Sequence, residues 1–173
     1  MFGKPRHIES ESALYEAAVK MLMRRAHSVH EMKKALARRC RDEKLIKAVL
    51  GRLKENKYLD DGLYAKQFTQ VRTVTRKQGQ FRIARDLRAR GIPDQHIETA
   101  LKDSAEEHDP AAMVRQRIER KLRLLRGEIS EKKIASLYRS LLAAGFPSDI
   151  VRKELFRATK EHVPEVDEPD KSS

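Results

Sequence analysis

The chain of 173 residues is long enough to bury a core and fits one domain or a short row of repeats, which excludes two large domains. Charged residues make up 37% and hydrophobic residues 39%, which favours an elongated helical protein, and the single cysteine, Cys40, excludes internal disulfides and a cysteine-based metal cage. The net charge of +12 indicates a polyanionic partner, of which nucleic acid is the most common in a cytoplasm.

Helical periodicity extends over most of the chain. Apolar residues recur at spacings of three and four, and no stretch alternates with a period of two, so we predict an all-α protein. Residues 1–11 are expected to be a flexible N-terminus, and the first helical segment covers residues 12–57. Within it, Ser28 and Glu31 form the capping box of a helix.

The second helical segment, residues 58–108, opens with two adjacent carboxylates, Asp60 and Asp61. Neighbouring carboxylates at a helix start point apart, so we interpret them as helix caps and not as a catalytic pair. Tyr58 and Leu59 precede them as a hydrophobic staple would. Gly91 stands where an apolar pattern ends, as expected for a turn after a helix.

Basic residues concentrate in this second segment. Between Lys66 and Arg90 there are eight basic residues and only one acidic residue, Asp86. Successive helical residues turn by 100°, which predicts a solvent-facing arginine stripe opposite Ile83 and Leu87. The residues that we expect to contact a polyanion are Arg72, Arg76, Lys77, Arg82, Arg85 and Arg88. The alternative is a solvated face that only keeps the protein soluble.

The third helical segment covers residues 109–160. Its helix starts are Asp109 before Pro110 and Ser130 before Glu131. A second basic block, residues 115–126, holds six basic residues against one acidic residue. The last 13 residues, 161–173, carry five carboxylates and one lysine, and we expect them to be a disordered acidic tail.

An internal repeat relates the three segments. Six positions recur at offsets of 51 and 54 residues. The first copy is Met32, Leu36, Cys40, Asp42, Ile46 and Leu50; the second is Ile83, Leu87, Gly91, Pro93, Ile97 and Leu101; the third is Leu137, Leu141, Gly145, Pro147, Val151 and Leu155. The sequence therefore predicts three tandem three-helix, helix-turn-helix-like repeats over 12–57, 58–108 and 109–160, stacked in an elongated, curved array.

The sequence contains no pattern typical of an enzyme. His27 and His30 bracket the helix start at Ser28, and no further ligand completes a zinc motif around them. The glycines form neither a dinucleotide fingerprint nor a phosphate-binding loop, so we expect no cofactor. Cys40 aligns with the turn glycines of the other copies, which indicates a small turn residue. A faint nuclease-like set, Pro93-Asp94 with residues 131–133, lacks the strands on which such chemistry sits.

The central segment resembles the RecX family of RecA regulators. The resemblance rests on residues 58–68, followed by Arg72 and by residues 79–92 with their turn at Gly91. Ser28, Glu31 and Leu36 fit the first unit of that family. The resemblance implies a non-enzymatic, curved helical protein that binds the RecA filament on DNA, lies along its groove and restrains filament growth. It also implies that Tyr58, Leu59, Asp60 and Asp61 matter for the fold.

Two classes of binding protein remain open at this stage. A RecA filament modulator accounts for the repeat and the signature residues, whereas a generic basic protein would use the same arginines on single- and double-stranded DNA without RecA. Base stacking is a poor fit to either, because aromatic residues such as Phe68 occupy core positions. The sequence shows no signal sequence and no apolar stretch approaching the roughly 20 residues of a membrane span, so we expect a cytoplasmic protein that does not contact membranes. We also expect a monomer.

Overall fold

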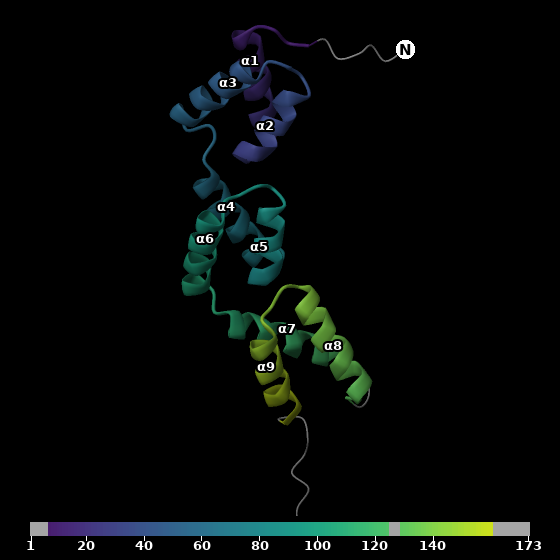
Figure 1. Cartoon of the computed structure of the whole chain (residues 1–173). Coiled ribbons are helices and arrows are strands. Elements are labelled where there is room, and N and C mark those ends of the chain that lie inside the picture. The colour runs from purple at the N-terminus through teal and green to yellow at the C-terminus, as the bar shows by residue number, and fades with distance from the viewer. Residues whose placement is uncertain (1–6, 125–128, 161–173) are drawn as a thin grey trace, which may run out of the picture. The chain divides into compact units, whose positions relative to one another are not determined.

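The computed structural model describes residues 7–124 and 129–160, which form nine helices and no strand (Figure 1). The helices are α1 (Glu11–Leu22), α2 (Val29–Ala37), α3 (Glu43–Glu55), α4 (Asp61–Val74), α5 (Gln80–Arg88), α6 (Asp94–Glu107), α7 (Pro110–Leu124), α8 (Glu131–Ala143) and α9 (Ser148–Lys160). The predicted all-α fold class is confirmed. Most of the expected flexible N-terminus, at residues 1–6, and the whole expected acidic tail, 161–173, lie outside the described residues.

The described residues divide into two compact units. The first unit contains residues 7–76 and 83–104, and the second contains residues 77–82, 105–124 and 129–160. No helix among the described residues is long and apolar enough to cross a membrane.

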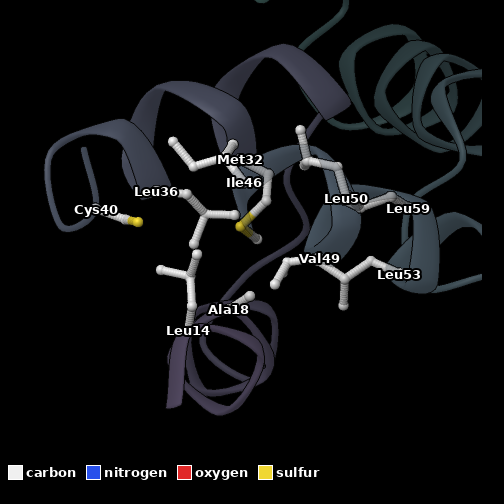
Figure 2. Packing of buried hydrophobic residues seen from close by; sticks show 10 residues of the cluster. All are labelled: Leu14, Ala18, Met32, Leu36, Cys40, Ile46, Val49, Leu50, Leu53 and Leu59. Atoms are coloured by element: carbon white, nitrogen blue, oxygen red, sulfur yellow. The ribbon is translucent and has the colours of Figure 1, made fainter. Parts of the chain in front are cut away.

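Each consecutive set of three helices surrounds its own hydrophobic cluster. In the first group, α1–α3, the apolar side chains point inward between the helices (Figure 2). Its buried residues are Leu14, Ala18, Met32, Leu36, Cys40, Ile46, Val49, Leu50, Leu53 and Leu59. The second group, α4–α6, buries Ala65, Ile83, Ala84, Leu87, Ile92, Ile97 and Ala100. The third group, α7–α9, buries Val114, Ile118, Leu137, Leu141, Ala144, Phe146, Val151 and Leu155. Burial of each large aliphatic side chain contributes about 1.5–3 kcal/mol.

Side-chain caps define several helix starts. The Ser28 hydroxyl accepts the backbone N–H of Glu31, and the Glu31 carboxylate accepts the N–H of Ser28, which confirms the predicted capping box. Asp109 accepts the N–H groups of Ala111 and Ala112 at the start of α7. These bonds satisfy donors that the first turn of a helix leaves without partners.

Three contacts hold the first and second groups together within the first unit. Asp61 Oδ1 accepts the backbone N–H of Val29 at 2.9 Å, so a residue of α4 caps α2. The Ser28 hydroxyl donates to the Arg90 carbonyl at 2.6 Å. Leu59, which precedes α4, is buried in the first cluster. The start of α2, the start of α4 and the turn after α5 are therefore held at fixed relative positions.

Backbone-to-backbone packing joins residues 77–82 to the α8–α9 turn within the second unit. The N–H of Gly79 donates to the Ala144 carbonyl at 2.8 Å, and the N–H of Phe81 donates to the Gly145 carbonyl at 3.0 Å. A Cβ atom at Gly79 would lie 2.3 Å from the Gly145 carbonyl, so only glycine permits this approach. The contact partly covers Arg82, whose Nε is buried.

Candidate functional site

A basic hollow lies on the first unit, where its first and second helix groups meet. Its volume is about 520 Å³, within the range of ligand-binding clefts, and it opens to solvent. Its lining comes from the α1–α2 connection, α2, α4 and the turn after α5. The lining residues are Arg25, Ala26, Glu31, Tyr64, Gln67, Phe68, Val71, Arg72, Arg76 and Arg90. Four arginines and one carboxylate give this hollow, which we call the main hollow, a formal charge of +3.

Phe68 organises two of these arginines. The guanidinium carbon of Arg72 lies 4.8 Å from the centre of the Phe68 ring, and that of Arg90 lies 4.7 Å from it. Tyr64 stacks beside Phe68 with ring centres 6.2 Å apart and planes inclined by 14°. Such cation–π contacts contribute about 0.5–2 kcal/mol and orient the guanidinium plane without neutralising its charge. The ring thus holds two cations; among the described residues the N–H groups of Arg72 remain available to an anion, whereas Nη1 of Arg90 donates to the Asp86 carbonyl.

The spacing along α4 explains why these side chains converge. Tyr64, Phe68, Arg72 and Arg76 follow one another every four residues, so they lie along one face of the helix. Arg76 extends this row just beyond the last residue of α4. Arg90 reaches the same ring from the turn after α5, where its Nη1 also donates to the Asp86 carbonyl at 2.6 Å.

Glu31 is the carboxylate in the lining of the main hollow, and it already forms an ion pair with Arg25. Its Oε2 accepts the N–H of Ser28 at 3.2 Å and Nη1 of Arg25 at 3.0 Å. Burial alone would raise the pKa of Glu31, but these two hydrogen bonds and the charges of Arg25 and His27 outweigh it and lower the pKa below its usual range. Burial also raises the pKa of Tyr64 above its usual value. Among the described residues, Arg72 and Arg76 form no ion pair.

A second basic hollow adjoins the main one. It has a volume of about 280 Å³. Its lining residues are Arg25, His27, His30, Glu31, Lys34, Ala35, Arg38 and Ala89. Because Arg25 and Glu31 line both hollows, their ion pair separates two adjacent basic recesses. We call this recess the side hollow.

The structure distributes the six predicted contact residues over both units. Arg72 and Arg76 lie together in the main hollow, and Arg85 and Arg88 lie on the part of α5 that belongs to the first unit. Lys77 and Arg82 belong to the second unit.

The predicted arginine stripe on α5 is not uniformly free. Arg85 and Arg88 are exposed, but Arg85 lies 3.6 Å from an Asp86 oxygen and Arg88 lies 2.8 Å from an Asp94 oxygen. Arg82 departs from the predicted solvent-facing stripe, because its side chain is partly buried beneath the Gly145 turn.

The predicted structural motif residues are placed as follows. Asp60 accepts the N–H of Leu63 at 2.9 Å and caps α4, whereas Asp61 caps α2. Leu59 is buried in the first cluster, and Tyr58 is exposed. Gly91 has a φ of +70° in the turn after α5.

Periodicity alone did not identify three residues of the main hollow as functional. Phe68, predicted as a core residue, packs against the second cluster but also lines the hollow. Its four-residue spacing from Arg72 was the available signal. Arg25 and Arg90 gave no local signal, because they approach the site only through the contact between the two helix groups. Among the described residues, no three potential metal ligands gather at one place.

Comparison with known proteins relates this chain to a family. Models of the first and second three-helix domains of RecX match residues 15–53 and 60–101. A regulatory protein RecX of Halorhodospira halophila is 40% identical over 95 residues, which cover 55% of this chain and 58% of that relative. A regulatory protein RecX of Prosthecochloris aestuarii is 32% identical over 131 residues, which cover 76% of this chain and 83% of that relative.

A solved structure shows the same fold. The crystal structure of RecX from Lactobacillus salivarius superimposes with a TM-score of 0.70 at 22% identity, covering 87% of this chain and 97% of that one. Both matched family segments lie in helices of the first and second groups, and the main hollow is built where these two groups meet.

Proposed function

Because this chain belongs to the RecX family, we propose that it is a regulatory protein that binds the RecA filament on DNA and mainly inhibits the recombinase, ATPase and coprotease activities of RecA. In this proposal it acts as a monomer in the cytoplasm, contacts both RecA and single- or double-stranded DNA, and catalyses no reaction of its own. The finer role therefore rests on the family together with the charge of the chain.

The observation that carries the DNA part of this proposal is the main hollow. Proteins hold the phosphate backbone mainly through arginine and lysine, and a concave basic surface concentrates the field of its charges. Arg72 and Arg76 lie there without a carboxylate partner among the described residues, in contrast to Arg85 and Arg88 on α5. A polyanion is the ligand class that this arrangement favours.

The proposed function is tested by titrating the protein into RecA on single-stranded DNA and measuring DNA-dependent ATP hydrolysis. A protein that contacts several RecA protomers, or blocks a growing filament end, should inhibit at fewer copies than there are RecA subunits. A generic DNA-binding protein would inhibit only when it covers the DNA, and added DNA would relieve that inhibition in proportion. Inhibition that begins only when the DNA is saturated would therefore refute the filament reading.

A charge-reversed variant tests the surface separately from the function. Replacing Arg72, Arg76 and Arg85 by Glu should abolish the inhibition while the helical circular dichroism signal is retained. If this variant inhibits RecA as strongly as the parent protein, the contact surface lies elsewhere. The parent protein, titrated in parallel, shows whether inhibition exists at all.

A further inference from the structure

The two basic hollows share one wall, and this arrangement suggests a binding mode more specific than general attraction to DNA. Arg25 separates the hollows and is held by Glu31 at 3.0 Å. On one side of this pair lie the arginines held by the Phe68 ring, and on the other lie Lys34 of α2 and Arg38, which follows the last residue of α2. A ligand that spans both hollows must carry at least two anionic groups joined by a short linker.

We propose that the main and side hollows together bind successive phosphates of one DNA strand. Glu31, which pairs with Arg25 between the two hollows, is the negative charge that limits the affinity. This inference rests on the proposed function and extends it by naming the chemical group that is bound and the residues that bind it. It concerns the first unit alone, in which every lining residue of both hollows lies.

The two arginines that lie over the Phe68 ring favour phosphates over bases as ligands of the main hollow. Two guanidinium groups already lie within 4.8 Å of the ring centre, so the ring acts as a support for cations and is less available as a stacking platform for a base. A guanidinium that lies over a ring can still present two N–H groups to a ligand, and this fork fits two oxygens of one phosphate. Recognition of this kind is independent of base sequence.

A variant of Glu31 tests the proposal through a gain of DNA affinity, which complements the loss expected when an arginine is replaced. Its carboxylate is the acidic group that lines both hollows, and it neutralises Arg25. Glutamine at this position keeps an oxygen that accepts the N–H of Ser28, because either residue completes a capping box. Glu31→Gln should therefore release Arg25 for a phosphate without removing the cap of α2.

The expected effects follow from counterion release. Each phosphate contact changes the affinity for a single strand by about five-fold at roughly 0.1 M salt, since the logarithm of the affinity falls with the logarithm of salt concentration with a slope of about 0.7 per contact. Arg72→Gln should thus weaken binding by about five-fold and lower the salt slope by one contact. Glu31→Gln should strengthen binding by a similar factor.

The matched control is Arg52→Gln. Arg52 is also placed over an aromatic ring, 4.3 Å from the centre of Tyr15, but it pairs with Glu11 at 2.8 Å and lines neither hollow. Its replacement removes the same charge from the first unit, so a general electrostatic attraction would respond to Arg52→Gln and Arg72→Gln alike. The proposal requires Arg52→Gln to change the affinity by less than half as much, on a logarithmic scale, as Arg72→Gln does.

The experiment is fluorescence anisotropy of a labelled oligothymidylate, of an abasic strand of the same length and of a duplex, titrated with each full-length variant. Equal losses on the oligothymidylate and the abasic strand, together with tighter binding by Glu31→Gln, are the expected result. A loss confined to the oligothymidylate would mean that the hollows read bases, and no loss by Arg72→Gln on any nucleic acid would mean that they do not bind DNA. Either outcome overturns the proposal. A duplex that responds as the single strands do supports it, because the phosphates of one strand are then the common ligand.

RecA measurements on the same variants separate this proposal from the proposed function. If Arg72→Gln retains full DNA affinity but loses binding to DNA-free RecA, the hollows bind an acidic protein surface and the phosphate assignment is wrong. If the parent protein binds DNA as described but never inhibits RecA, the proposed function fails and the phosphate assignment stands.

Discussion

Replacing Gly91 by alanine should strongly destabilise the first unit. Gly91 has a φ of +70°, and a Cβ atom added there would lie 2.5 Å from both Cβ and Cγ of His30 at the start of α2. Ordinary carbon–carbon contacts are about 3.5–4.0 Å, so α2 or the turn would have to move by about 1 Å. The left-handed backbone costs an alanine about 1–2 kcal/mol, and the overpacking adds about 1–3 kcal/mol. The expected loss in the free energy of unfolding is therefore about 2–5 kcal/mol.

Urea unfolding followed by circular dichroism measures this loss, and two further variants test the reasoning. Gly51→Ala is the matched control, because Gly51 lies inside α3 with nothing within 4 Å of an added Cβ, and it should stabilise the protein by about 0.5–1 kcal/mol. Gly91→Asn tolerates the left-handed backbone better but retains the clash, so it should remain destabilising. If Gly91→Ala unfolds within about 0.5 kcal/mol of the parent protein, the tight contact with His30 does not exist.

Two other perturbations have defined outcomes. Asp61→Ala should weaken α2, a helix of the neighbouring group, by about 1 kcal/mol, whereas Asp61→Asn should retain most of that cap. Amide exchange at Val29 and its neighbours measures this effect, and unchanged protection in Asp61→Ala would contradict the cap between the two groups. The pKa of Glu154 is lowered because Arg115 donates two hydrogen bonds to its buried carboxylate. The ion pair therefore stabilises the fold at neutral pH, and this stabilisation disappears as falling pH protonates the carboxylate. The difference in unfolding free energy between the parent protein and Glu154→Gln should thus shrink in acid, and a constant difference would show that the charge of Glu154 is unimportant.

Local sequence patterns were sufficient for the all-α fold class and for the helix starts. The capping box of Ser28 and Glu31 depends only on residues three apart, and the apolar spacing of Ile83 and Leu87 depends only on the pitch of one helix. The family resemblance likewise rests on a continuous stretch, residues 58–68. All of these features are encoded within a few turns of chain.

Such patterns predicted only part of the candidate site. Arg72 was predicted as a contact residue, and its position four residues after Phe68 places both on one helix face. The predicted arginine stripe did not anticipate that Arg88 pairs with Asp94 or that Arg82 is partly buried. These differences arise from neighbours in other elements, which helical periodicity does not encode.

The chain by itself determined where the helices form and that their exposed faces are basic, because periodicity, capping and charge act over short distances along the sequence. Only the tertiary structure decided that Arg25 and Arg90, 65 residues apart, converge on one hollow with Phe68. It also decided that Asp61 caps a helix of the preceding group. The physical reason is that these contacts form between the surfaces of two helix groups, which are held together by the Asp61–Val29 and Ser28–Arg90 hydrogen bonds and by the close approach of Gly91 to His30, and not by any local propensity.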